Sequence, residues 1–144
     1  MRAVVTRVSS ASVETGGAVH GEIKKGLLVL LGIKTTDTRC EAEKLAAKVC
    51  NLRIFSDDAG KMNLSLKDAG GDLLVISQFT LYADLKSRRP GFTEAAPPDI
   101  AVPLYEYFIN ECKKSGFRVE TGVFGAMMDV KSVNDGPVTI IMEV

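Results

Sequence analysis

The chain has 144 residues, of which 46% are hydrophobic and 25% charged, and its 18 basic and 18 acidic side chains balance. This length predicts a single domain spanning residues 1–144. The charge balance excludes a generally basic nucleic-acid coat protein and an acidic solvating tail. No apolar run approaches the roughly 20 residues of a membrane-spanning helix, and the N-terminus lacks the continuous apolar stretch of a signal peptide. Three cysteines without C-x-x-C spacing argue against a disulfide framework or zinc site and favour a reducing compartment, the cytoplasm.

The first half of the chain predicts three strands followed by a helix. Alternating apolar and polar residues indicate a strand at 2–13. Gly16-Gly17 then predicts a hairpin turn, because glycine adopts positive φ without a steric penalty, and the next strand returns antiparallel. The apolar run 26–33 is typical of a strand buried on both faces. Thr38 and Glu41 match the capping box of a helix, whose apolar face follows a 3.6-residue period at Ala42, Leu45, Ala46, Val49 and Leu52.

The second half predicts a buried strand at 73–76 that runs into polar residues, a polar loop at 82–98 and a helix at 99–114. Pro103 is expected near the first turn of this helix, where a missing N–H does least harm. Gly116 is expected just beyond the last turn, as the C′ residue.

Short strands complete the prediction, with Asn134–Pro137 as the turn between the last two. The element order, roughly βββ-α-ββ-α-βββ, indicates an α+β fold with a mainly antiparallel or mixed sheet and two helices. One of these strands is expected to begin near residue 52. The other three are expected to cover 117–121, 127–133 and 138–144.

Candidates for catalysis are few. His20 is the single histidine, so any mechanism that needs two imidazoles is excluded, and a solvent-facing or structural role is the simpler interpretation of it. The segment Ser77-Gln78-Phe79-Thr80 ends a buried strand with polar side chains, which are costly unless paired and often face a pocket. Thr80 can act as a nucleophile if a base is adjacent, but a strand end capped by hydrogen bonds is the simpler interpretation of this segment alone.

Two motifs, SQFTL at 77–81 and NDGPVT at 134–139, together resemble the D-aminoacyl-tRNA deacylase family. Further matches to that family occur in the same order along the whole chain. They are the opening residues 2–13, Arg89-Pro90 with Phe92, Leu104-Tyr105 with Phe108, and the segment Phe124-Gly125-Ala126-Met127-Met128.

The resemblance implies a barrel-like α+β domain that acts as a homodimer and uses no metal or organic cofactor. It implies hydrolysis of the ester that joins a D-amino acid, or glycine, to the 3′-terminal adenosine of tRNA. Gly136-Pro137 would be a cis dipeptide that enters the partner's active site and leaves no room for an L side chain, with Arg7 orienting it. Ser77, Gln78, Phe79 and Thr80 would line the reacting ester, and Phe124, Gly125 and Met128 would cradle the adenine.

Ester hydrolysis needs an activated nucleophile and a site for the developing oxyanion. Thr80 has no base nearby in sequence, so we favour hydrolysis assisted by the vicinal ribose hydroxyl, with the N–H groups of Phe79 and Thr80 as oxyanion donors. Lys86, Arg88 and Arg89 are candidate phosphate contacts, although a solvated loop is the simpler interpretation of their charge alone. Direct attack by the Thr80 hydroxyl remains an alternative mechanism. A non-catalytic RNA-binding module and a small-molecule ester hydrolase that uses Thr80 remain alternative functions.

Overall fold

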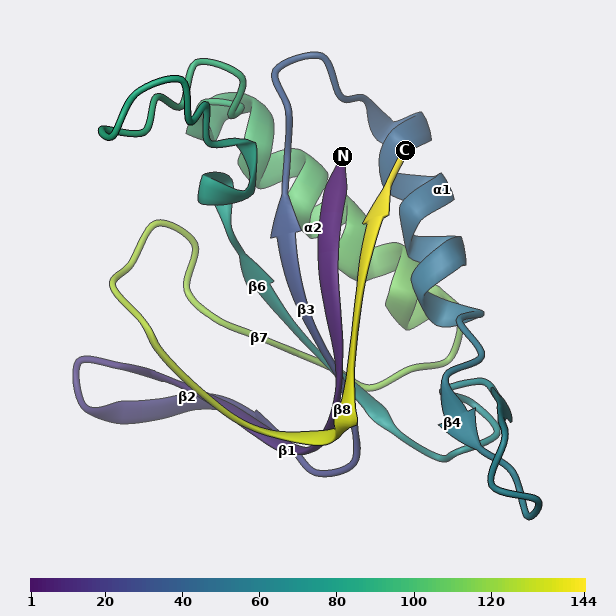
Figure 1. Ribbon diagram of the computed structural model, residues 1–144. Coiled ribbons are helices and arrows are strands. Elements are labelled where there is room, and N and C mark those ends of the chain that lie inside the picture. Colours follow the sequence, from purple (N-terminus) through teal and green to yellow (C-terminus); the bar gives the residue numbers. More distant parts are fainter.

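The computed structural model describes residues 1–144, and its sheet is organised around one long strand, β1 (Arg2–Thr15). Strands β2 (Ala18–Ile23), β3 (Gly26–Gly32) and β8 (Asp129–Glu143) all pair with β1 in the antiparallel sense. One strand has three partners because β1 bends, so that its first half pairs with β3, its second half with β2, and both halves with β8 (Figure 1).

Two parallel pairings extend the sheet beyond β3. Strand β6 (Asp72–Ser77) pairs with β3, and β7 (Val119–Thr121) pairs with β6, which gives the order β2-β1-β3-β6-β7. The two ends of this order approach each other: a side chain at Gly21 in β2 would lie 2.8 Å from the carbonyl oxygen of Thr121 in β7. The mixed sheet therefore curls into a nearly closed barrel, and the α+β prediction with two helices is confirmed.

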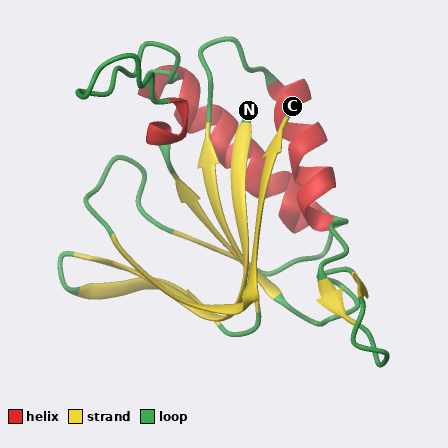
Figure 2. Ribbon diagram, in the orientation of Figure 1, coloured by secondary structure: helices red, strands yellow, loops and turns green.

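Both helices, α1 (Arg39–Cys50) and α2 (Pro98–Lys114), lie on the same side of the sheet (Figure 2). The main core lies between them and β1, β3 and β6, with Phe108 of α2 fully buried among residues of all these elements. The remaining elements are a small hairpin of β4 (Phe55–Ser56) and β5 (Met62–Leu64), and the 3-10 turn η1 (Phe79–Tyr82).

Local signals in the first half of the sequence predicted the structure well. The Gly16-Gly17 turn has positive φ at both residues and joins β1 to β2. Helix α1 begins after Thr38 with both hydrogen bonds of the capping box formed. The strand expected from residue 52 is reduced to the two residues of β4, and Leu52 lies beyond the end of α1.

Two predictions about prolines were wrong. Pro103 lies inside α2, beyond its first turn, because the helix already begins at Pro98. Asn134–Pro137 is not a turn between two strands, because β8 runs without reversal from Asp129 to Glu143 and both of its halves pair with β1. Pairing of β1 with the residues on either side of this segment therefore overrides its local turn preference.

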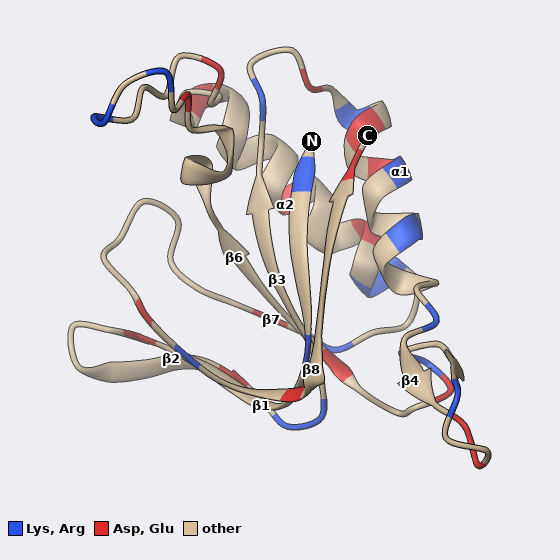
Figure 3. Cartoon of the chain, viewed as in Figure 1, with Lys and Arg blue, Asp and Glu red and all other residues tan.

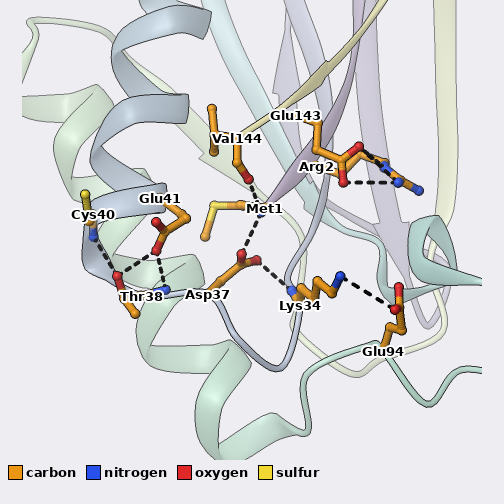
Figure 4. A network of polar contacts seen from close by, with 10 residues as sticks. All are labelled: Met1, Arg2, Lys34, Asp37, Thr38, Cys40, Glu41, Glu94, Glu143 and Val144. Carbon is orange, nitrogen blue, oxygen red and sulfur yellow. Dashed lines mark hydrogen bonds and ion pairs between the residues drawn. The ribbon is translucent and has the colours of Figure 1, made fainter.

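A polar network ties the two chain ends to the loop before α1 (Figure 4). The N-terminal ammonium of Met1 donates to the Asp37 carboxylate at 2.7 Å and to the carbonyl oxygen of Val144 at 3.0 Å. Asp37 also accepts the N–H of Lys34 at 2.7 Å. None of the helices has the length and apolar character that crossing a membrane requires.

Candidate active site at the end of strand β6

The segment Ser77–Thr80 lies where the buried strand β6 ends. Leu73 to Ile76 are all buried, and the N–H of Gln78 continues the pairing by donating to the carbonyl oxygen of Leu31 at 2.8 Å. The chain then turns sharply: the N–H of Leu81 donates to Gln78 at 3.2 Å, which closes the first turn of η1. Sequence analysis missed this 3-10 turn. The first N–H that donates within this turn is that of Leu81. The N–H groups of Phe79 and Thr80 precede it and therefore form no hydrogen bond with a carbonyl of the turn itself.

A pocket of about 330 Å³ opens beside this turn. The loop that follows β7 covers the pocket. Gly122 in this loop packs closely against Met128 and Ile76, because a side chain at Gly122 would collide with the Met128 thioether and lie 3.2 Å from Ile76. Its lining residues are Leu31, Ile33, Ile76, Ser77, Gln78, Phe79, Ala96, Ala101, Phe124, Gly125, Ala126, Met127, Met128 and Val130. This lining is mostly apolar and contains no Asp, Glu, His, Lys or Arg, so no titratable acid or base faces the pocket.

The aromatic wall of the pocket is anchored to β6. Phe124 meets Tyr105 of α2 edge to face, with 5.7 Å between ring centroids. The buried hydroxyl of Tyr105 donates to the carbonyl oxygen of Val75 at 2.7 Å. Burial raises the pKa of Tyr105 above its usual value, so this hydroxyl stays protonated as a donor. The position of Phe124 is thus set by the strand that carries Ser77.

Thr80 stands at the edge of the pocket and does not line it. Its exposed hydroxyl accepts a hydrogen bond from the amide nitrogen of Gln78, and no carboxylate, histidine or lysine contacts it. His20 is exposed on β2 and is not among the lining residues. No group of three or more His, Cys, Asp or Glu side chains is arranged to hold a metal ion.

Arg2 holds the far end of η1, a role the sequence analysis did not anticipate. One nitrogen of its guanidinium donates to the carbonyl oxygen of Leu81 at 2.6 Å. Two others donate to Glu143, and Figure 4 shows this second contact. The guanidinium carbon also lies 4.9 Å from the centre of the Tyr82 ring. Because Glu143 faces Arg2 across the β1–β8 pairing, the sheet register itself places this contact.

A second group of expected site residues lies in an irregular part of β8. Thr6 pairs with Thr139 and Val8 with Asn134, so residues 135–138 stand opposite Arg7 alone and bulge out of the strand. We refer to residues 135–138 as the bulge. Its Gly136-Pro137 bond is cis.

Arg7 holds the bulge from beneath. Its side chain is buried and donates to the carbonyl oxygen of Asp135 at 3.1 Å and to that of Ile54 at 2.5 Å, and it pairs with the Asp135 carboxylate at 3.2 Å. Gly136 has a φ of +123°, and a side chain there would lie 2.8 Å from the Arg7 guanidinium. Glycine is therefore required at this position both by the backbone and by the contact with Arg7.

The structure thus divides the expected residues into two sets. Ser77, Gln78, Phe79, Phe124, Gly125 and Met128 line the pocket, and Thr80 adjoins it. Arg7, Gly136 and Pro137 lie at the bulge, and none of them lines the pocket of the same chain. Sequence reasoning missed the apolar lining from Leu31, Ala96 and Ala101, because their positions depend on how distant segments pack.

Fold and pocket define a small α+β protein with a mostly apolar pocket of about 330 Å³ at a strand end and no acidic or basic side chain in its lining. Comparison with known proteins gives the family. The family model described as D-Tyr-tRNA(Tyr) deacylase matches residues 4–143. A D-aminoacyl-tRNA deacylase of Desulfatibacillum aliphaticivorans is 60% identical over 144 residues, 99% of each chain. That of Thermosipho africanus is 56% identical, over 99% of this chain and 97% of the relative.

Solved structures agree in fold. One titled "c-Myc DNA Unwinding Element Binding Protein" has a TM-score of 0.95 at 42% identity and covers 100% of this chain and 99% of its own. A second, titled as a probable eukaryotic D-amino acid tRNA deacylase, has a TM-score of 0.86 at 16% identity, covers 99% and 98%, and shows the shared fold alone. The chain belongs to the D-aminoacyl-tRNA deacylase family and is a hydrolase of that family.

Proposed function

We propose that this chain hydrolyses the ester between a D-amino acid and the 3′-terminal adenosine of tRNA, and releases free tRNA and the D-amino acid. The observation that carries the proposal is the pocket at the end of β6, which combines an apolar, aromatic wall with a turn that presents backbone donors. Its volume of about 330 Å³ lies in the range of small-molecule sites. In this proposal Phe124, Gly125 and Met128 hold the adenine, and Ser77, Gln78 and Phe79 face the ester.

The chemistry that suits this pocket is assisted by the substrate. Water adds to the ester carbonyl carbon, the N–H groups of Phe79 and Thr80 stabilise the oxyanion, and the 3′ oxygen leaves with a proton. No side chain of the pocket can act as the general base, so the vicinal 2′-hydroxyl of the ribose orients and activates the water. The Thr80 hydroxyl, bonded only to Gln78, has no base to remove its proton as a nucleophile.

We propose further that Gly136-Pro137 supplies the chiral filter, in the pocket of a second copy of the chain. Support comes from the position of the bulge, which is exposed and held rigidly by Arg7 yet does not contribute to its own chain's pocket. Its carbonyls would accept hydrogen bonds from the substrate ammonium and occupy the space of an L side chain. A D side chain would point away, and glycine, which has no side chain, would also be accepted.

The long strand β8 favours a homodimer as the assembly that brings the bulge to a pocket. Residues 129–137 of β8 are exposed, and the strand pairs with β1 on one side only. Val130 and Val133 are large apolar side chains within this stretch, 38% and 57% exposed. A long unpaired strand edge with apolar side chains is a natural surface for pairing with another chain.

Mixed dimers test whether the pocket and the bulge act across subunits. Ala126→Trp would fill the pocket and Gly136→Ala would displace the bulge, so each variant alone should be nearly inactive. If the two variants are unfolded together and refolded, about half of a symmetric dimer population is mixed, and each mixed dimer has one intact site. Recovery of roughly a quarter of wild-type activity supports the cross-subunit site, and no recovery contradicts it.

The central experiment compares D-tyrosyl-tRNA, L-tyrosyl-tRNA and glycyl-tRNA. We expect the protein to hydrolyse the D-tyrosyl and glycyl esters and to leave the L-tyrosyl ester intact. In the cell this activity would belong to the cytoplasm, where aminoacyl-tRNA is used. A non-catalytic binding module is the alternative function that the DNA-binding title of one similar structure suggests. Such a module would leave every ester intact. A small-molecule hydrolase would prefer an amino acid ester without tRNA, and its activity would depend on Thr80.

A further inference from the structure

The loop between η1 and α2, residues 83–97, has a base that is fixed beside the pocket. Asp84 and Gly91 exchange two backbone hydrogen bonds of 2.8 and 2.9 Å, which close the loop across residues 85–90. The next residue, Phe92, meets the ring of Phe79 edge to face, with 5.0 Å between centroids. Since Phe79 lines the pocket, residues 85–90 project from the pocket's edge.

This projecting segment is the part of the loop that carries positive charge. It contains Lys86, Arg88 and Arg89 and no acidic residue, and all three side chains are exposed. Lys86 lies 3.4 Å from the Asp84 carboxylate. The guanidinium groups of Arg88 and Arg89 form no ion pair and no hydrogen bond within the chain. Figure 3 shows the basic tip of this loop at the upper left, beyond the end of α2.

Most other arginines of the chain have polar partners. Arg2 pairs with Glu143, Arg7 with Asp135 and Arg118 with both Asp72 and Glu120, and Arg53 donates to the carbonyl oxygen of Asn63. Arg39 on α1 forms no ion pair and lies over the Tyr107 ring. In a chain with no net charge, two neighbouring guanidinium groups without a carboxylate partner form a local excess of positive charge. Guanidinium groups bind phosphate with two parallel hydrogen bonds, and exposed ones are free to do so.

We propose that residues 85–90 form a phosphate-binding surface for the single-stranded 3′ end of tRNA. This inference rests on the proposed function, which places the terminal adenosine in the pocket beside Phe79. The phosphates of the nucleotides that precede this adenosine then leave the pocket at its edge, where Arg88 and Arg89 contact them. Phosphate contacts position a nucleic acid without reading its sequence, so the loop supplies affinity for any tRNA and the pocket supplies selection.

The test removes two charges from the loop and changes the substrate. The double variant Arg88→Ala, Arg89→Ala is expected to raise KM for D-tyrosyl-tRNA about tenfold with kcat unchanged, and to flatten the dependence of log(kcat/KM) on log salt by about 0.7 for each lost phosphate contact. With 3′-O-(D-tyrosyl)adenosine, which has no phosphate, KM and kcat should equal those of the wild type.

A matched control removes two exposed lysines on α1, in Lys44→Ala, Lys48→Ala, far from the pocket lining. This control should match the wild type on both substrates, which separates local contacts from the general loss of charge. Equal impairment of the loop variant on the tRNA and adenosine esters would overturn the proposal, because the loop would then act through the pocket. So would an unchanged salt dependence.

Binding of uncharged tRNA, measured by fluorescence anisotropy, makes the test independent of catalysis. We expect the loop variant to bind about tenfold more weakly than the wild type and the α1 control. Equal binding overturns the phosphate surface even if the enzyme is active. A further outcome is that the loop variant loses tRNA binding while the wild type hydrolyses neither ester. That result would support the phosphate-binding surface and refute the proposed function.

Discussion

The pocket and the bulge are built in opposite ways. The pocket lies at the end of the buried strand β6, and its shape depends on four separate stretches of the chain, 31–33, 76–79, 96–101 and 124–130. The bulge depends on one side chain, Arg7, which fixes residues that are otherwise exposed. A concave, apolar site and a convex, polar projection are complementary in form. They do not meet within one chain, and this separation is what the proposed site between two copies must bridge.

The sharpest test of the pocket changes the substrate and leaves the protein unaltered. A D-tyrosyl-tRNA that ends in 2′-deoxyadenosine, with the amino acid on the 3′ oxygen, should be hydrolysed about 10³-fold more slowly, the size of a general acid–base contribution. The reason is that no titratable side chain lines the pocket, so the missing hydroxyl has no replacement. Single-turnover rates at saturating enzyme measure this effect on chemistry alone.

Thr80→Ala is the companion measurement and should keep activity within about tenfold of the wild type, because backbone donors survive the substitution. The opposite ordering, with a loss of 10³ or more for Thr80→Ala and normal turnover of the deoxy substrate, would assign the nucleophile to Thr80.

The next largest effect should come from the bulge. Gly136→Ala is expected to lower kcat/KM for D-tyrosyl-tRNA about 100-fold, as small displacements of positioning groups do. A side chain there meets the Arg7 guanidinium at 2.8 Å and Val138 at 2.9 Å, at a φ of +123°.

Gly16→Ala is the matched control, since Gly16 also has positive φ but has no atom within 4 Å of the added carbon. That variant should lose some stability, measured by thermal unfolding, and no activity. If both glycine variants lose activity equally, the bulge has no special part in the site.

Much of this architecture is predictable from local sequence, but the pocket and the bulge are not. Capping at Thr38, the glycine turn after β1 and the apolar run of β3 each depend on neighbours in sequence, so pattern and propensity predict them. Asn134–Pro137 has ideal turn composition, yet long-range pairing with β1 on both sides of residues 135–138 keeps β8 from reversing, and Arg7 holds the unpaired residues. The family resemblance named these residues as functional, whereas their composition alone predicted a different backbone.

A smaller effect is expected where the sheet supports η1. Arg2→Ala removes the hydrogen bond to Leu81 and should lower kcat about tenfold with KM nearly unchanged, because the donors of Phe79 and Thr80 lose their fixed position. Arg2→Lys keeps a donor and should recover part of kcat.

Arg118→Ala, which removes an exposed arginine with two carboxylate partners away from the pocket, is the control and should leave both constants unchanged. A rise in KM alone for Arg2→Ala would show that Arg2 contributes to binding and not to the geometry of the turn.

The smallest effect should come from a residue in neither the pocket nor the bulge, Glu41 in the capping box of α1. The hydroxyl and the N–H of Thr38 both donate to its carboxylate, at 2.6 and 2.8 Å, and these bonds hold the pKa of Glu41 below its ordinary value of 4.5 (Figure 4). A carboxyl whose pKa is lower in the folded state stabilises the protein above its unfolded pKa, and that contribution is lost as the pH falls through the folded pKa. Glu41→Gln should therefore unfold at a slightly lower temperature than the wild type at pH 7, and the difference should shrink as the pH falls below 4.5 and through the lowered pKa of the folded state. Thermal unfolding followed by circular dichroism between pH 7 and pH 3 measures the difference, and deacylation of D-tyrosyl-tRNA at pH 7 should be unchanged.

A difference that stays constant down to pH 3 would show that the charge of Glu41 is not what stabilises the helix. A loss of activity would show that α1 supports the pocket more directly than its position suggests.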